Sequence, residues 1–473
     1  MPRRARCSHG LRSRPLRFPR LCRPCRRPRL PSTPNSPVPD ARHGWRWAPA
    51  WVLAYVALWP TKGVAEGVMT LGALVAIWLL VQARFAGGTR LLSREAWALT
   101  SVLFAAYWLP ELVSALDAVD VPRALREAAV DLRYLPFLWL VAASVANADA
   151  RRRTFQGLAI IAAIWCFDAL LQAASGTSAL QAALDTAKQG LTGKPLCPAD
   201  EAHAFGRITG VFSDCNPKLG QVLASLSPFV LHLAAQRFRA GGWLFAAAAL
   251  GMAIVLAGSR ASWITYGLVL LFSGWRLLGW KRLLGVFAFG AIALGVLAAT
   301  LPAVRERIER TTQALAVSEE GVDSALSGRS RIWSAAVCMA REHPVNGVGA
   351  RGFREAFPAC DPQPGEKAEW GEGPALHAHQ IVLEVASETG GFGLLLWLAG
   401  AALAWRAWRY ADARSRLQAR PAMLALAVTV FPFNTHLAFY STFWGGLTLM
   451  LAALYAGSLL DRDRPVATEA PAR

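Results

Sequence analysis

Residues 283–303 read LLGVFAFGAIALGVLAATLPA, a run without a single charged side chain. An α-helix of about 20 apolar residues is long enough to cross the hydrocarbon core of a bilayer. Similar apolar segments recur along most of the chain, so the sequence predicts an all-α polytopic membrane protein with about twelve transmembrane helices. The expected spans are 47–60, 64–83, 96–115, 133–148, 155–174, 216–236, 241–258, 262–280, 283–303, 389–408, 421–440 and 443–460.

The overall composition agrees with a membrane location. Of the 473 residues, 54% are hydrophobic and only 17% are charged. Soluble domains carry about 25% charged residues and have fewer long apolar runs. A soluble globular protein of this length is therefore excluded.

The basic charge is concentrated at the N-terminus. The formal net charge is +19, and residues 1–46 contain 13 arginines but only one acid, Asp40. This Pro-rich segment lacks an apolar period, so we expect a disordered basic tail. It is not followed closely by the apolar core of about 7–15 residues that a signal peptide has. The tail either lies against anionic lipid or results from a start site placed too far upstream; a nucleic-acid partner is not expected.

The Lys and Arg residues of short loops predict that both termini face the cytoplasm. Inner loops then contain Arg151-Arg152-Arg153, Lys281-Arg282 and the Arg-rich stretch 406–420. Arg123 and Arg126 fall in an outer loop and count against this topology, although acidic residues accompany them. Two outer segments are long, 175–214 and 305–378, and long loops within compact proteins usually carry function.

This topology divides the chain into five parts. They are the basic tail (1–46), helices one to nine (47–303), a long outer loop with short helices (304–380), helices ten to twelve (381–460) and a cytoplasmic tail (461–473). Within the loop, residues 327–342 are expected to form a helix that ends at His343-Pro344 and Gly347.

A polar island closes the long loop, just before an apolar run. It reads Leu376-His377-Ala378-His379-Gln380. A His-x-His pair without a third or fourth ligand in reach is weak evidence for zinc. A neutral imidazole near the membrane surface suits a general base, because its unperturbed pKa of about 6.5 is close to working pH. The alternative is that a histidine only anchors the helix that follows.

Arginines are unusually frequent on the outer side. Arg260 lies in the tight turn Gly258-Ser259-Arg260, with almost no loop to carry its charge into water. An anionic ligand would complement it, because guanidinium binds phosphate through two parallel hydrogen bonds. The alternative is that Arg260 reaches a lipid phosphate. Arg329 and Arg331 point to different faces of the expected helix, so we expect one of them to serve the site. Arg305 to Arg310, Arg351 and Arg354 are interpreted as solvated.

The eight cysteines do not define a metal site. Cys22 and Cys25 have CxxC spacing, but no second pair accompanies them. Cys197, Cys338 and Cys360 fall in outer segments, where a disulfide is possible. The sequence alone does not select the pair.

Four segments resemble the O-antigen ligase and polymerase superfamily of membrane glycosyltransferases. They occur in the family's order between residues 200 and 400. They are Gly206-Arg207-Ile208-Thr209-Gly210 with Asn216-Pro217; Gly258-Ser259-Arg260; Arg329-Ser330-Arg331-Ile332-Trp333 with His343-Pro344-Val345-Asn346-Gly347-Val348-Gly349; and His377-Ala378-His379-Gln380 with Leu383-Glu384 and Glu388-Thr389-Gly390. The last motif more often reads His-Asn, and here Gln380 replaces the Asn.

The resemblance implies a glycosyltransferase-C-like fold and an O-antigen ligase of the bacterial inner membrane. Such an enzyme transfers a glycan from undecaprenyl pyrophosphate to a sugar of lipid A-core at the periplasmic face, in lipopolysaccharide biosynthesis. It implies a metal-independent, inverting reaction without a cofactor, in which the loop 304–380 is periplasmic and catalytic. His379, Arg329 and Arg260 are then the expected catalytic residues. The residues expected to bind pyrophosphate or glycan are Arg207, Arg331, His377 and Glu384.

Several alternatives remain open at the level of sequence. An O-antigen polymerase or a ligase that glycosylates pilin would share the donor chemistry and differ in the acceptor. A transporter of an anionic solute would place charge at the membrane midplane, often with inverted repeats, whereas these charges gather at one face. A non-catalytic assembly protein would not need the concentrated Arg and His residues.

Overall fold

The computed structural model describes residues 46–61, 63–85, 91–198, 207–215, 217–313, 329–368, 370, 373–432, 434 and 438–460. The expected basic tail 1–46, apart from its last residue, and the expected tail 461–473 lie outside these ranges. The described residues form helices joined by turns and contain no β-strand, which confirms the all-α fold class.

Among the described residues, eight helices are long and apolar enough to cross a membrane. They are α2 (Val64–Phe85), α3 (Arg94–Ser114), α6 (Ala148–Ser175), α8 (Leu219–Leu256), α9 (Arg260–Leu278), α10 (Trp280–Thr300), α15 (Ile381–Tyr410) and α17 (Thr442–Leu460). Three shorter helices lie where further spans were expected: α1 (Ala48–Ala57), α5 (Tyr134–Ala143) and α16 (Ala413–Thr429). Each expected span therefore overlaps a helix, although α16 ends at Thr429 within the expected span 421–440, and length and composition identify only eight of the described helices as candidate spans.

Helix α8 accounts for two of the expected spans. The chain reverses at Arg239, whose φ of 54° and ψ of −139° are not helical. After the reversal a Cβ at Gly242 would lie 2.6 Å from the carbonyl oxygen of Ala234, which only glycine tolerates. The two halves of α8 thus form a hairpin, and the second half returns across the bundle.

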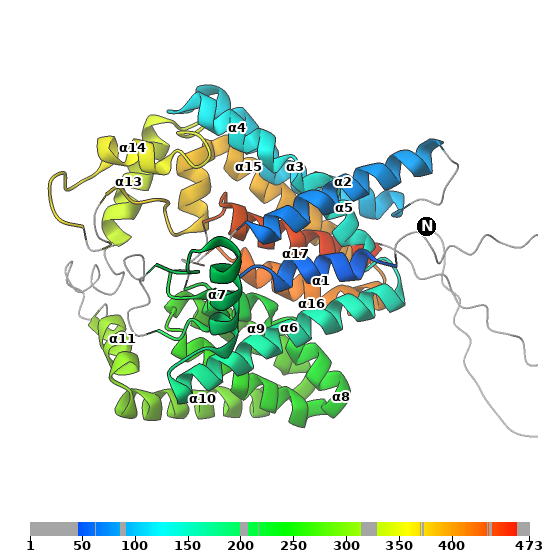
Figure 1. Cartoon of the computed structure of the whole chain (residues 1–473), viewed down its shortest axis with the longest axis vertical. Coiled ribbons are helices and arrows are strands. Elements are labelled where there is room, and N and C mark those ends of the chain that lie inside the picture. The colour runs from blue at the N-terminus through cyan, green and yellow to red at the C-terminus, as the bar shows by residue number, and fades with distance from the viewer. Residues whose placement is uncertain are drawn as a thin grey trace, which may run out of the picture. The chain divides into compact units, whose positions relative to one another are not determined.

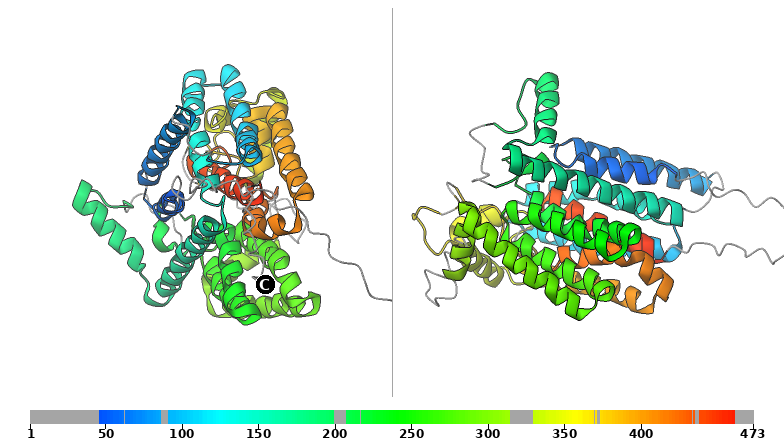
Figure 2. Two further views of the ribbon diagram at one scale, coloured as in Figure 1. Left: turned by 90° about the vertical axis from the view of Figure 1, so that its right-hand side faces the viewer. Right: turned by 90° about the horizontal axis from the view of Figure 1, so that it is seen from below.

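Helix α17 forms the centre of the bundle. Every residue from Trp444 to Leu459 is buried. The helix packs against α3, α5 and α16, and Figure 1 shows it enclosed between them. In the right-hand view of Figure 2 the long helices run side by side, and the yellow helices of the long loop gather at one end. This end carries the residues of interest.

The long loop has a small core of its own. The loop contains the helices α11 (Pro302–Gln313), α13 (Arg329–Glu342) and α14 (Phe353–Cys360). Ile332 and Met339 of α13 pack with Phe353 and Phe357 of α14 in a hydrophobic cluster separate from that of the bundle. A disulfide joins Cys338 to Cys360. The expected helix 327–342 is present from Arg329 onward, and residues 327 and 328 lie outside the described ranges.

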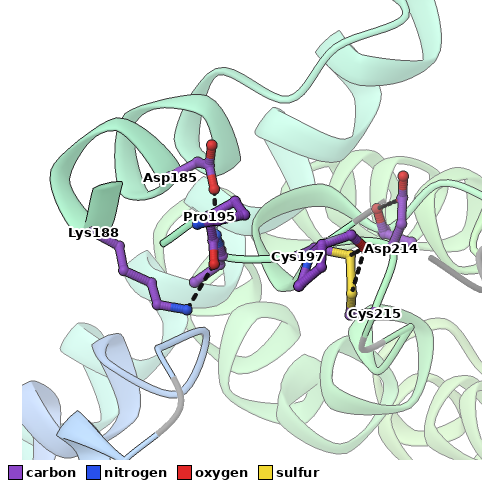
Figure 3. The surroundings of a disulfide bond; sticks show 9 residues. Asp185, Lys188, Pro195, Cys197, Asp214 and Cys215 are labelled. Atoms are coloured by element: carbon purple, nitrogen blue, oxygen red, sulfur yellow. Dashed lines mark hydrogen bonds between the residues drawn. A yellow bond between two sulfur atoms is a disulfide. The ribbon is translucent and has the colours of Figure 1, made fainter. Parts of the chain in front are cut away.

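The other long outer segment is held by a second disulfide, between Cys197 and Cys215 (Figure 3). It includes α7 (Ala179–Thr192) and the 3₁₀ turn η3 (Gly210–Phe212). Lys188 of α7 donates a hydrogen bond to the carbonyl of Pro195 at 2.8 Å, and Asp185 accepts one from the backbone of Leu196. Both disulfides lie in or directly beside the two segments that the sequence places outside. Cys215 was not expected as a partner because it directly precedes an expected span.

Candidate functional site

Three arginines from separate segments meet at the loop end of the bundle. Arg329 is the first residue of α13, Arg260 is the first residue of α9, and Arg207 precedes η3. The pKa of Arg329 is lowered to about 10, first by burial and then by the positive charges of Arg260 and Arg207. Guanidinium groups influence one another in this way only at short range. The structure therefore brings together three of the predicted site residues.

The local fold explains why these segments converge. Gly258 adopts a φ of 72° in the turn before α9, a conformation that glycine adopts without strain. A Cβ at Gly258 would lie 2.5 Å from Cζ of Arg307, so the guanidinium of this residue of α11 covers the turn. The backbone N–H of Ile208 donates to the carbonyl of Leu256 at 3.3 Å, which ties the Arg207 segment to the end of α8.

The two histidines of the polar island lie beside the arginines. The ring centroids of His377 and His379 are 3.9 Å apart. Burial lowers the pKa of His377 to about 4, with the charges of Arg329 and then Arg354 as further causes. His377 is therefore neutral at neutral pH. His379 has a φ of 53°, in the left-handed region that few non-glycine residues adopt.

The histidine segment is fixed from two sides. The indole N–H of Trp333 in α13 donates to the carbonyl of Ala378 at 3.1 Å. The Gln380 side chain caps α15 by accepting from the N–H of Leu383 at 2.6 Å. Its amide nitrogen also donates to the carbonyl of Pro432 at 2.9 Å. Gln380 thus performs an N-cap role that an asparagine would also suit.

Arg331 has a different environment from Arg329. Its guanidinium binds Asp361 through two hydrogen bonds of 2.7 and 2.6 Å, and it also donates to the carbonyls of Gln363 and Glu366. It lies 5.5 Å from the ring centroid of Trp370. These contacts stabilise the loop itself, so of the two candidates only Arg329 is placed within the arginine cluster.

Glu384 lies in the protein interior, with 1% of its surface exposed. Its Oε1 accepts a hydrogen bond from the backbone N–H of Tyr440 at 3.2 Å. This contact joins the start of α15 to the segment before α17. The structure therefore assigns Glu384 a supporting contact beneath the histidines.

Sequence reasoning missed the role of Arg351, which it interpreted as solvated. The guanidinium binds Glu127 and Asp131 of α4 (Val121–Asp131), with 2.9 Å between Nη2 and Asp131 Oδ2. It also donates to the carbonyl of Tyr440 at 2.6 Å, and its backbone N–H donates to Glu388 at 2.7 Å. The sequence did contain a signal for this role, namely the acidic residues in or beside apolar segments. A buried carboxylate needs a cationic partner, and an outer arginine could have been assigned as that partner.

The arrangement offers a dense positive charge next to a neutral imidazole. Among the described residues, one group of Cys and Glu side chains has the spacing of metal ligands. The group of possible ligands found there, Cys338, Glu342 and Cys360, includes two cysteines that form a disulfide and so lack thiolates. A site of guanidinium groups suits phosphate oxygens, which accept their hydrogen bonds in pairs.

Comparison with known proteins agrees with this geometry. Residues 245–398 match the family model described as O-antigen ligase. The match includes the Arg260 turn, the start of α13 and the polar island, whereas Arg207 lies before it. No curated protein matches the sequence significantly. Through this central segment, the chain is similar to the O-antigen ligase family.

Proposed function

We propose that this protein is an O-antigen ligase of the bacterial inner membrane. It transfers a glycan from undecaprenyl pyrophosphate to a sugar of lipid A-core at the periplasmic face. The observation that carries this proposal is the convergence of Arg207, Arg260 and Arg329 beside His377 and His379. A pyrophosphate is the part of the donor that such a cluster would bind.

In this mechanism the arginines bind the pyrophosphate and stabilise the charge that it gains as it leaves. Arg329 and Arg260 have the principal roles, and Arg207 adds to the positive potential. Guanidinium groups held in place by the protein stabilise developing charge without reorganisation, which is a large contribution to many enzymatic rates. The leaving group then needs no proton.

His379 acts as the general base. The hydroxyl oxygen of the acceptor sugar attacks the anomeric carbon from the face opposite the pyrophosphate. The bond between that carbon and the pyrophosphate oxygen breaks, and the electron pair leaves with undecaprenyl pyrophosphate. The hydroxyl proton passes to the imidazole, and the anomeric configuration inverts. His377, which is neutral and close to His379, orients the ring of His379 or the acceptor sugar.

The disulfides support the proposed orientation. Cys197–Cys215 and Cys338–Cys360 both belong to segments expected on the outer side. Disulfides form and persist in oxidising compartments such as the periplasm and are rare in the cytosol. Arg207 and Arg329 of the arginine cluster lie on the same two segments.

The test is glycan transfer by purified protein with a lipid-linked donor and lipid A-core as acceptor. Arg329→Ala should reduce turnover by about 10²–10³-fold, as for loss of a charge-stabilising donor. Arg329→Lys should recover only part, because lysine lacks the two-pronged geometry. Arg341→Ala provides the matched control, since Arg341 is an exposed residue of the same helix.

His379→Ala should lose about 10²–10⁴-fold in rate and still bind the donor, because general-base help has this magnitude. Full activity of Arg329→Ala or His379→Ala would remove that residue from the mechanism. If EDTA stops the reaction and a divalent metal restores it, the histidines bind a metal and His379 is not the general base. Transfer onto a second glycan donor or onto pilin, but not onto lipid A-core, would overturn the proposed acceptor.

A further inference from the structure

A cavity of about 280 Å³ lies between the turn that joins α1 to α2, the 3₁₀ turn η3, and the starts of α8 and α17. It adjoins the loop end of the bundle, because Phe212 in its wall follows Arg207 closely along the chain. On another side Thr442 lines the cavity shortly after Tyr440, whose backbone N–H donates to Glu384 beneath the histidines. None of the residues that line the cavity has a part in the proposed glycan transfer.

Aromatic side chains form the walls of this cavity. Trp59 and Phe212 are buried, and each pairs edge to face with Phe443. The ring centroids are 5.4 Å apart in the pair with Trp59 and 6.3 Å apart in the pair with Phe212. The hydroxyl of Tyr134 donates to the carbonyl of Thr442 at 2.8 Å, which fixes the backbone directly before Phe443. The aromatic surfaces are therefore held in place before any ligand enters.

Charged groups of both signs line the same cavity. Glu66 lies in the first turn of α2 and is exposed, and the ammonium of Lys218 lies 4.1 Å from the ring centroid of Phe443. Oε2 of Glu66 accepts a hydrogen bond from Arg133 at 3.1 Å. A carboxylate can accept about four hydrogen bonds, so this contact leaves Glu66 able to accept others. Glu66 and Lys218 are the charged side chains among the described residues of the lining, and their charges are opposite.

This combination of groups indicates the kind of ligand. A pyranose ring has a face of C–H groups that packs on an aromatic ring, and an edge of hydroxyls that bonds to carboxylate and ammonium groups. A pyrophosphate would be repelled by Glu66, and a hydrocarbon chain would cover polar groups without offering them hydrogen bonds. Small-molecule sites begin at about 300 Å³, so the cavity has room for a single sugar ring rather than a longer glycan.

We propose that the cavity binds one uncharged pyranose ring of a glycan substrate. The ring packs against Phe443 and Trp59, and its hydroxyls bond to Glu66 and Lys218. The identification of the glycan rests on the proposed function, in which the ring belongs either to the core oligosaccharide of the acceptor or to the repeat unit of the donor. The cavity then recognises a sugar other than the one that reacts, and so contributes to the choice of glycan.

The experiment measures binding of delipidated glycans by the full chain in nanodiscs, without any lipid-linked donor. The two probes are core oligosaccharide released from lipid A and repeat-unit oligosaccharide released from its carrier, each titrated by calorimetry. One of them should bind saturably, and its identity assigns the cavity to the acceptor or to the donor. Because no transfer occurs in this measurement, it does not depend on the catalytic residues.

Two variants connect this binding to the cavity. Phe443→Leu should weaken it about 2–10-fold, the effect of losing one aromatic contact. Glu66→Gln should weaken it about fivefold, because a charge-assisted hydrogen bond is about twice as strong as a neutral one. In glycan transfer both variants should raise KM for the same substrate and change kcat little, as expected for a contact equally strong in the ground and transition states.

Phe289→Leu and Asp117→Asn are the matched controls. Both residues are exposed and lie outside the lining, so their substitution should leave binding unchanged. Failure of both oligosaccharides to bind the wild type would overturn the site, as would equal binding by wild type, Phe443→Leu and Glu66→Gln. Binding that weakens only in the two cavity variants, from a wild type that transfers no glycan, would support the sugar site and overturn the proposed function instead.

Discussion

The role of each arginine is decided by its partners rather than by its position in the sequence. Arg329 and Arg331 are two residues apart on one helix. Arg331 is held by the Asp361 carboxylate, whose pKa this contact lowers, whereas Arg329 lies near other cations. Arg351, in turn, is neutralised by the acids of α4. Sequence reasoning selected the residue type and the segment, but carboxylates distant in sequence determine which guanidinium groups form ion pairs within the protein.

A prediction at this scale concerns the charge state of His377. Its pKa is lowered to about 4 by burial and then by Arg329 and Arg354. Removing a positive charge favours the protonated ring, so Arg354→Gln should raise this pKa. If transfer requires a neutral ring, the loss of activity on acidification should then move to higher pH. Between pH 6.5 and the lowered pKa of about 4, His377 is neutral in the folded protein. In the unfolded chain the same histidine binds a proton below about pH 6.5. The contribution of His377 to folding stability therefore decreases as the pH falls through this range.

The measurement is the pH dependence of glycan transfer for wild type, Arg354→Gln and Arg341→Gln. Only the Arg354 variant should shift the acidic limb upward. Identical acidic limbs for all three proteins would show that the protonation of His377 does not control the reaction.

Among the elements, the junction between the 343–349 turn and α15 holds the site together. The turn pairs with the helix through backbone hydrogen bonds, Val348 N–H to Ser387 and Gly391 N–H to Pro344, of 2.9 and 2.8 Å. Gly390 interrupts α15 at this point with a φ of 62° and a ψ of −161°. A Cβ there would overlap the carbonyl of Val345. Glycine is needed because both the conformation and the close approach exclude a side chain.

Gly390→Ala should therefore destabilise the protein by about 1–3 kcal/mol from backbone strain alone, with an additional cost for the overlap. It should also reduce transfer, because α15 begins directly after the histidines. The comparison is Gly267→Ala in the interior of α9, where a Cβ would meet nothing within 4 Å. That change should be neutral or stabilising by up to about 1 kcal/mol. Thermal unfolding of the purified variants decides the matter, and equal stability of the two would contradict the role given to this junction.

The elements also show how far sequence reasoning reached. Apolar runs located helices at all of the expected spans, because a bilayer leaves few alternatives to helix. The non-helical residues Arg239 and Gly390 lie between the expected spans 216–236 and 241–258 and at the start of the expected span 389–408, respectively. Sequence reasoning did not predict the small hydrophobic core of the long loop, the disulfide partner of Cys197 or the burial of Arg351. Each of these depends on contacts between distant residues, which a local pattern does not record.

For the whole molecule, arginines gather at opposite ends of one bundle. The arginine cluster and both disulfides lie at one end, and the Arg-rich loops that we expect on the inner side lie at the other. This polarity follows from the positive-inside distribution together with long outer segments that tolerate charge. It requires the loop 355–375 and the residues around Arg152 and Arg414 to lie on different sides of the membrane.

Reporter fusions test this requirement directly. A reporter placed within 355–375 should be active only as a periplasmic protein, and fusions at Arg152 or Arg414 should report the cytoplasm. Thiol labelling of the whole protein provides an independent check: the cysteines at 338 and 360 should become reactive toward an impermeant reagent only after reduction, because they are paired. A cytoplasmic signal from the 355–375 loop would place the arginine cluster on the side where lipid A-core sugars are not presented for ligation. The proposed acceptor and the proposed base would then both be wrong, whatever the activity of the purified variants.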